Sequence, residues 1–187
     1  MSRARTVADF GAGTISAANV TGLTQGITMT DQWRVNSGIS QGTGHSETVI
    51  NTNLEQCDEG TFGSIGSSMT QSSGVFTFPE TGIYLITFVG TYYAIDGNHA
   101  RYVYTYIKTS TDGGSNWDGF SNPLESVGNS DAGTEFASAT AQAMFDVTNT
   151  STHKVRFSFA SDLPGLICDG STGGNMSYMT FIRLGDT

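Results

Sequence analysis

Positive charge is scarce in this chain of 187 residues. Only 8 lysines and arginines oppose 17 aspartates and glutamates, which gives a formal net charge of −9 at pH 7. Such a chain does not neutralise phosphates, so the composition argues against nucleic acid and against an anionic membrane surface as partners. No apolar run approaches the roughly 20 residues of a membrane helix, and none follows the N-terminal arginines as in a secretory signal. These absences predict assembly in a cytoplasm.

Cysteine is nearly absent as well: the only two are Cys57 and Cys168. Two cysteines without an export signal favour free structural thiols, although a disulfide between them stays open. The three histidines, His45, His99 and His153, lie far apart and show no metal-ligand spacing. The sequence therefore predicts neither a metal nor another cofactor.

Glycine and aromatic residues are what the chain does have. Its 24 glycines and 11% aromatic residues, beside only 3 prolines, favour many short strands joined by polar turns. The length fits one domain with a single core. Strands are expected at 27–35, 75–78, 83–93, 101–109, 140–147, 153–160 and 176–184, with weaker ones near 48–54 and 61–65. About 8–10 strands without an amphipathic helix predict an all-β antiparallel jelly-roll sandwich.

The strand expected at residues 83–93, IYLITFVGTYY, is apolar on both faces. Alternation places one set of side chains opposite the other: Ile83, Leu85, Thr87 and Val89 on one face, and Tyr84, Ile86, Phe88 and Tyr92 on the other. In an antiparallel sandwich the outer face of a sheet normally meets water. Because no helix is predicted to cover that face, we expect a second subunit to cover it.

Two segments resemble the jelly-roll family shared by the globular heads of complement component q and tumour necrosis factor (TNF). Residues 74–88, GVFTFPETGIYLITF, are similar to the family pattern G-x-F-x-x-P-x-x-G-x-Y-x-x-x-F, and residues 177–184, SYMTFIRL, are similar to its closing strand. In layout the resemblance covers residues 28–187. It implies a compact homotrimer in which one sheet of each subunit faces a three-fold axis.

Carried over position by position, the resemblance assigns a role to single residues. It places five side chains at the trimer axis: Leu85, Thr87, Val89, Tyr178 and Ile182. It places four others in the sandwich core: Tyr84, Ile86, Phe88 and Phe181. Thr87 stands where the family often has an aromatic residue, which implies a less tightly packed axis.

Residues 1–26 form a leader of small residues with few charges, which we expect to act as a docking arm beside a jelly-roll trimerisation domain at 27–187. The residues of the arm expected to contact a partner are Arg3, Arg5, Val7, Phe10, Ile15, Val20 and Leu23. The opening SRAR, followed by ADFGAGTISAANVTGL, resembles structural proteins of marine bacteriophages. This resemblance implies a virion protein.

Two short motifs match patterns found in enzymes, but neither requires an enzymatic function here. Gly38-Ile39-Ser40-Gln41-Gly42 fits the G-x-S-x-G pattern of serine hydrolases, but that mechanism needs a strand-to-helix turn at Ser40, and a polar loop is expected at 36–46. Residues 110–117, STDGGSNW, resemble an aspartate box, which is a hairpin turn in most proteins. Calcium binding by Asp112, Asn116 and Asp118 is the less favoured alternative, because the spacing departs from the EF-hand loop.

Tyr102, Tyr104 and Tyr106 share one face of the strand expected at 101–109. Such a row can form a sugar-stacking platform, but it more often packs in the core or along the edge of a sandwich, and that packing is expected here.

The sequence thus predicts a non-enzymatic trimeric structural protein of a bacteriophage virion. The favoured role is a capsid decoration or cement protein, whose partners are itself and the capsid shell. The alternative is a receptor-binding knob on a tail fibre or spike, which would recognise a glycan or protein on the host surface. Its contacts would come from the loops at 41–47, 110–123 and 126–134.

Overall fold

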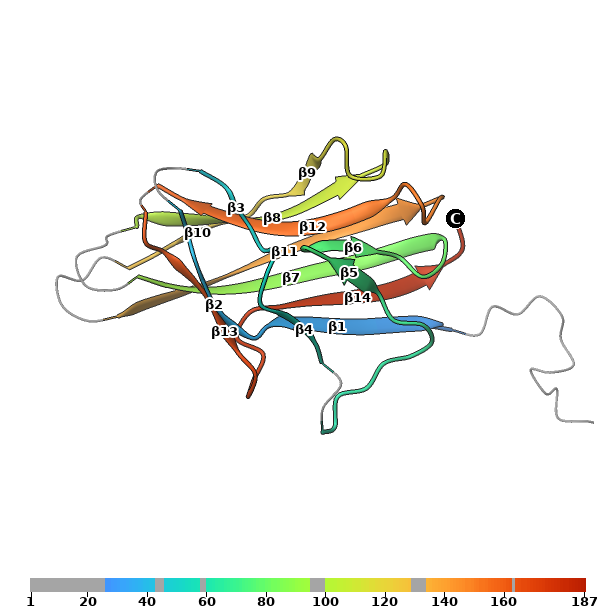
Figure 1. Cartoon of the computed structure of the whole chain (residues 1–187), viewed down its shortest axis with the longest axis horizontal. Helices are drawn as coiled ribbons and strands as arrows, with labels where there is room; N and C mark the ends of the chain where they lie inside the picture. Colours follow the sequence, from blue (N-terminus) through green and yellow to red (C-terminus); the bar gives the residue numbers. More distant parts are fainter. Residues whose placement is uncertain (1–25, 43–45, 58–59, 95–99, 129–133, 163) are drawn as a thin grey trace, which may run out of the picture.

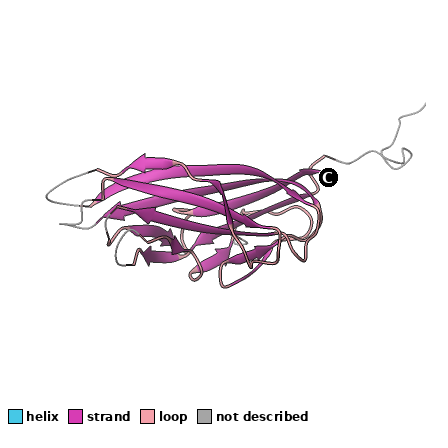
Figure 2. Cartoon of the chain, turned by 90° about the horizontal axis from the view of Figure 1, so that it is seen from above, coloured by secondary structure: helices cyan, strands magenta, loops and turns pink. Residues whose placement is uncertain are grey.

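A computed structural model describes residues 26–42, 46–57, 60–94, 100–128, 134–162 and 164–187, and within these ranges it contains strands and no helix. No helix among them could therefore span a membrane. The strands form two stacked antiparallel layers, with β8 (Tyr102–Ser110) and β12 (Lys154–Ser161) in one and β14 (Tyr178–Gly185) and β1 (Met29–Val35) in the other (Figure 1; Figure 2). The predicted all-β sandwich is confirmed.

Each layer is a seven-stranded sheet. Sheet A consists of β1, β14, β2 (Ser37–Ser40), β4 (Leu54–Gln56), β7 (Gly82–Ala94), β11 (Glu135–Val147) and β13 (Ile167–Ser171). Sheet B consists of β8, β12, β3 (Thr48–Val49), β5 (Thr70–Ser72), β6 (Val75–Thr77), β9 (Asp118–Ser121) and β10 (Leu124–Ser126). Strand β7 lies inside sheet A, because β11 pairs along one of its edges while β14 and β13 share the other.

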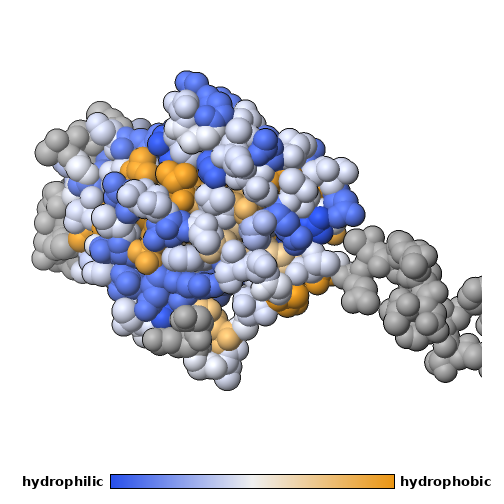
Figure 3. Space-filling view, turned by 45° about the vertical axis from the view of Figure 1, so that its right-hand side comes forward, coloured by the Kyte–Doolittle hydropathy of each residue, from blue (hydrophilic) through white to orange (hydrophobic). Residues whose placement is uncertain are grey.

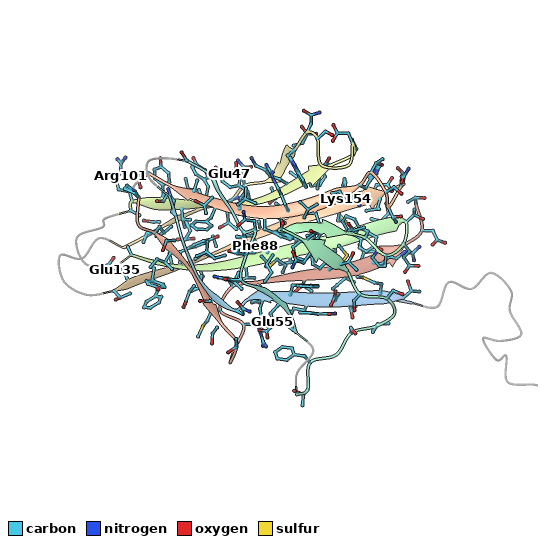
Figure 4. The ribbon with its side chains drawn as sticks, in the orientation of Figure 1. Glu47, Glu55, Phe88, Arg101, Glu135 and Lys154 are labelled. Atoms are coloured by element: carbon cyan, nitrogen blue, oxygen red, sulfur yellow. The ribbon has the colours of Figure 1, made fainter. Side chains whose placement is uncertain are left out.

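An aromatic cluster fills the space between the sheets. Phe88 of β7 and Phe181 of β14 meet Phe157 of β12 with ring centroids 5.3 and 5.9 Å apart. The four side chains assigned to the core from the sequence, Tyr84, Ile86, Phe88 and Phe181, are fully buried. Figure 4 shows Phe88 between the two layers. This part of the residue-by-residue prediction is confirmed.

Two turns explain why two glycines stand in the segment that resembles the TNF family: Gly74 lies in the turn between β5 and β6, and Gly82 begins β7. Gly74 has φ +77°, and a Cβ there would lie 2.2 Å from the carbonyl oxygen of Ile50. Gly82 has φ +146°, and a Cβ there would lie 2.5 Å from Arg183 Nε. Both positions therefore require a residue without a side chain.

A buried carboxylate holds the long connection between β4 and β5 against the sandwich. Asp31 in β1 accepts hydrogen bonds from the backbone N–H of Met69 at 2.8 Å, from Gln56 Nε2 at 3.0 Å and from Trp33 Nε1 at 2.9 Å. Gln56 precedes the connection and Met69 ends it. One side chain thus holds both ends of the segment in place.

Several short strands differ from the sequence expectation. The polar loop expected at 36–46 contains β2, the strand expected at 48–54 is split into β3 and β4, and 61–65 provides one isolated bridge, from Ile65 to Thr30. Strands β5, β9, β10 and β13 were not predicted. These segments are short and polar, and the sheet edges against which they pair decide their conformation.

Both cysteines are free and buried, so the predicted free thiols are confirmed and the disulfide alternative is excluded. Burial raises the pKa of the Cys168 thiol to about 12, and it also raises the pKa of Cys57. Cys57 Sγ donates a hydrogen bond to Asn175 Oδ1 at 3.4 Å. Neither thiol is therefore ionised near neutral pH.

Candidate trimer interface

The outer face of sheet A brings together the five residues assigned to the trimer axis. We call Leu85, Thr87, Val89, Tyr178 and Ile182 the assembly face. Across strands β7 and β14, Tyr178 lies opposite Val89 and Ile182 lies opposite Leu85. All five side chains are half-buried in the single chain. The predicted residues therefore share one continuous surface, and their burial against other subunits stays a prediction.

Strand β11 adds residues to this face that the sequence did not indicate. Met144 lies opposite Leu85 and Gln142 lies opposite Thr87, because β11 pairs with the free edge of β7. Met144 is 64% exposed. Met144 is an apolar residue on the otherwise polar side of an alternating strand, which signals that the apolar face extends onto β11. The pairing of β11 with β7 was not predicted.

A polar row crosses the assembly face between two more apolar rows. Gln142 Nε2 donates a hydrogen bond to Thr87 Oγ1 at 3.2 Å, and Gln32 Nε2 donates one to Thr180 Oγ1 at 3.0 Å. Asn175 Nδ2 in turn donates to Gln32 Oε1 at 2.7 Å. The hydroxyl oxygens on this row thus have hydrogen-bond partners within the subunit, as a polar group must if it is to be buried at low cost.

An ion pair between a buried arginine and a half-buried glutamate borders the face on the side of β4. Arg34 is 2% exposed, and its Nε lies 2.9 Å from Glu55 Oε2. Its guanidinium also lies 6.0 Å from the centroid of the Phe62 ring. Glu55 is seen in the lower layer in Figure 4.

The surface displayed in Figure 3 carries apolar patches that are separated by hydrophilic residues.

Ser40 does not occupy the turn that a serine hydrolase requires. It lies in strand β2, where it pairs with Ile167 of β13, and its side chain is exposed. A nucleophile of this class stands on a strand-to-helix turn. His45 and His99 lie outside the described residues, and His153 lies immediately before β12, where its ring meets the hydroxyls of Thr148 and Thr152.

Asp112 closes the turn predicted at residues 110–117. Its carboxylate accepts hydrogen bonds from the Asn116 backbone N–H at 2.9 Å, from Asn116 Nδ2 at 2.6 Å and from Ser110 Oγ at 2.7 Å. These bonds, first among them those from Asn116, lower the pKa of Asp112 to about 2. The Asp112 side chain therefore stabilises the turn.

Among the described residues, no three His, Cys, Asp or Glu side chains are grouped to hold a metal ion.

The three tyrosines of β8 lie on the outer face of sheet B and not in the core. Val103, Thr105 and Ile107 are buried instead, whereas Tyr102, Tyr104 and Tyr106 are half-buried. The rings were expected to pack in the core or along the edge of the sandwich; they pack against one another on the outer face of a strand that is paired on both edges. Thr105 gives the physical reason. Its hydroxyl lies 2.7 Å from the Tyr92 hydroxyl inside the sandwich, so this face of β8 turns inward and the tyrosines turn outward.

The residues assigned to the docking arm, from Arg3 to Leu23, lie outside the described residues. That assignment therefore stays a prediction.

Comparison with solved structures identifies the fold. The crystal structure of murine APRIL at pH 5.0 matches with a TM-score of 0.53 and 11% sequence identity, over 83% of this chain and 98% of that chain. Eiger TNF from S. frugiperda matches with a TM-score of 0.52 and 10% identity, over 87% and 96% of the two chains. No protein-family model and no curated protein matches the sequence. The chain has a TNF-like jelly-roll fold, as the resemblance of residues 74–88 implied, while the likeness of the leader to bacteriophage proteins stays a prediction.

Proposed function

We propose that this chain is a non-enzymatic structural protein that forms a homotrimer through the assembly face. The observation that carries the proposal is that Leu85, Val89 and Ile182 are apolar and only half-buried on the outer side of two interior strands, β7 and β14. Burying apolar area contributes roughly 25 cal/mol per Å², which offsets the entropy lost on association. The TNF-like fold favours three copies over another number.

The solution mass tests this proposal directly. Gel filtration with light scattering should give three times the 19.8 kDa mass of the chain at micromolar concentration. A single-copy mass that persists at the highest soluble concentration would contradict the trimer.

The specific role that we propose is decoration of a bacteriophage capsid. The support is the resemblance of the leader to phage structural proteins, and a leader of about 26 residues can reach at most ~90 Å when extended. In this role the trimer sits on the shell and the arm contacts the capsid. Labelling the protein on purified virions and imaging them tests the role, because a decoration protein is present in hundreds of copies on the head.

A receptor-binding knob on a tail fibre or spike is the second candidate. The tyrosine row on the outer face of sheet B favours it, since aromatic rings that are half-buried on a rigid sheet are typical of recognition surfaces. A knob would occur in a few copies at the tail. The label position on the virion therefore separates the two roles.

A further inference from the structure

Arg156 on β12 is the one described lysine or arginine that donates no hydrogen bond and forms no ion pair. In the parts of the chain that the structure describes, every other cation donates to an oxygen atom of the protein: Arg34, Arg101, Lys108, Lys154 and Arg183. Arg156 Nε is buried without a partner, and its two Nη atoms have none among the described residues. A guanidinium that lacks an acceptor is an exception in a chain with 17 acidic residues.

The carboxylate nearest to Arg156 on this face already serves another cation. Arg156 lies opposite Lys108 of β8, and Glu47 interacts electrostatically with both. Glu47 is hydrogen-bonded to Lys108 Nζ and accepts a second bond from Ser158 Oγ at 2.7 Å. The positive charge of Arg156 therefore has no carboxylate of its own.

A second cation on the same side of β12 is held by neutral groups. Lys154 lies two residues from Arg156, so both side chains leave the outer side of sheet B. Lys154 Nζ donates to Thr77 Oγ1 at 3.0 Å and to the Thr150 carbonyl at 2.9 Å. Figure 4 shows Lys154 and Glu47 in the same layer. Lys154 therefore adds attraction for an anion near Arg156.

Trp117 holds the plane of the Arg156 guanidinium. Arg156 Cζ lies 4.4 Å from the centroid of the indole ring, which is a close cation–π contact. The indole packs against the turn at 110–117, since a Cβ on Gly114 would lie 3.3 Å from Trp117 Cζ2. Asp112 stabilises this turn from within. The turn thus positions a ring over β12, and the guanidinium loses little side-chain entropy when a ligand binds.

The open part of Arg156 is its Nη edge. Nε is its only buried nitrogen without a partner, so solvent reaches the two Nη atoms. The parallel N–H groups of such an edge match the two oxygens of a carboxylate. Phosphate sites commonly add backbone N–H groups at a helix N-terminus, and the described chain has no helix. A carboxylate is therefore the better match.

We propose that Arg156 and Trp117 form a binding site for a carboxylate group of a ligand from outside the chain. The Nη edge donates two hydrogen bonds to the carboxylate oxygens, while Trp117 fixes the guanidinium from its face. The site lies on sheet B, whereas the assembly face lies on sheet A. It therefore goes beyond the proposed structural role and does not depend on the trimer.

NMR titration of the full chain with sodium acetate and with tetraglutamate tests the proposal. At least one should shift the indole N–H signal of Trp117 in a saturable way, while that of Trp33, which donates to Asp31, stays in place. Phosphate at the same ionic strength should bind at least about fivefold more weakly. Tighter binding of tetraglutamate per carboxylate assigns the site to a polypeptide ligand, and equal binding assigns it to a small acid.

Variants separate the fork from simple charge. Arg156→Gln should weaken binding at least about tenfold, and Arg156→Lys, which keeps the charge but loses the fork, at least about threefold. Trp117→Ala should weaken it roughly three- to tenfold, whereas Trp117→Phe keeps a flat ring and most of the affinity. Lys154→Gln is the matched control, because it removes one positive charge from the same side of β12, and its affinity should stay within about twofold of the parent.

The proposal is overturned if neither acetate nor tetraglutamate shifts the Trp117 signal or if phosphate is preferred. It is also overturned if an Arg156 variant binds as tightly as the parent, or if Lys154→Gln loses as much affinity as Arg156→Gln. If Trp117→Ala disturbs the turn, which the Asn116 amide signal reports, Trp117→Phe and the two Arg156 variants decide the outcome.

Discussion

Thr87 and Thr180 lie directly opposite each other at the centre of the assembly face, and each hydroxyl oxygen accepts a hydrogen bond from a glutamine. Polar pairs of this kind stabilise neighbouring strands by a few tenths of a kcal/mol to about 1 kcal/mol. Within an oligomer interface a single polar layer can also fix the register of the subunits. The pair therefore explains how the proposed axis can tolerate threonine where related patterns have an aromatic residue.

Leu85→Asp should convert the proposed trimer into monomer or aggregate. Three unpaired carboxylates would be buried about one axis, each costing roughly 3 kcal/mol or more, which weakens association at least about 100-fold. Tyr178→Asp should act in the same way, because Tyr178 shares the face. Light scattering after gel filtration measures the change in mass.

Leu124→Asp provides the matched control for this substitution. Leu124 is 50% exposed on β10 of sheet B, so a carboxylate there stays in water and the oligomer should persist. A Leu85→Asp protein with the mass and thermal stability of the parent would refute the assignment of the axis.

Deleting residues 2–26 should leave the oligomer intact and abolish docking on the capsid. The described core begins at β1, so the sandwich and the assembly face keep their contacts. Co-sedimentation with capsids that lack the native protein measures docking. Truncated protein that still decorates those capsids would show that the arm is not the anchor, and circular dichroism checks that the truncated chain is folded.

Both thiols should resist a disulfide reagent until the protein unfolds. Cys168 is fully buried, and at pH 8 its thiol is neutral because burial raises its pKa to about 12. The native chain should therefore release little chromophore from 5,5′-dithiobis(2-nitrobenzoate), and the unfolded chain should release two equivalents. A Cys57→Ser variant isolates the signal of Cys168. Rapid reaction of that variant under native conditions would contradict the burial.

The turn at residues 110–117 should loosen only in strong acid. The pKa of Asp112 is lowered from 3.8 to about 2, so its contribution to the turn is complete above pH 4 and is lost as the pH falls towards 2. The amide signal of Asn116 in NMR spectra should therefore hold its position at pH 4 and move between pH 3 and 2.

Asp112→Ala should displace the Asn116 amide signal at neutral pH, whereas Asp118→Asn should not, because the Asn116 amide bonds to Asp112. A signal that titrates near pH 4 in the parent would argue against the hydrogen bonds of Asp112.

The long strands could be predicted because their two faces differ in polarity. Period-two alternation places Phe157 and Phe159 of β12 in the core without further information. The same rule fails for β8, where both faces carry apolar atoms and alternation cannot tell which face turns inward. Thr105 faces inward because the Tyr92 hydroxyl offers it a buried partner, and a contact between distant strands is not visible in either segment alone.

The residues at the centre of the outer face of sheet A were predicted from the sequence, whereas those at its edge on β11 were not. Leu85, Thr87 and Val89 belong to one strand, and the resemblance supplied Tyr178 and Ile182 from the next. Met144 was missed because its place beside Leu85 depends on which edge of β7 receives β11. That choice is made by the topology of the sandwich, and the spacing of residues along one strand does not encode it.

The hydrogen bonds that Asp31 accepts from Gln56 and Met69 are useful for protein engineering. Since the carboxylate holds both ends of the connection, its length can vary between them without moving the sheets. Gly60 to Gly63 are exposed within this span. A foreign epitope inserted there would be displayed outward, and on a repeating assembly it would be presented many times at fixed spacing.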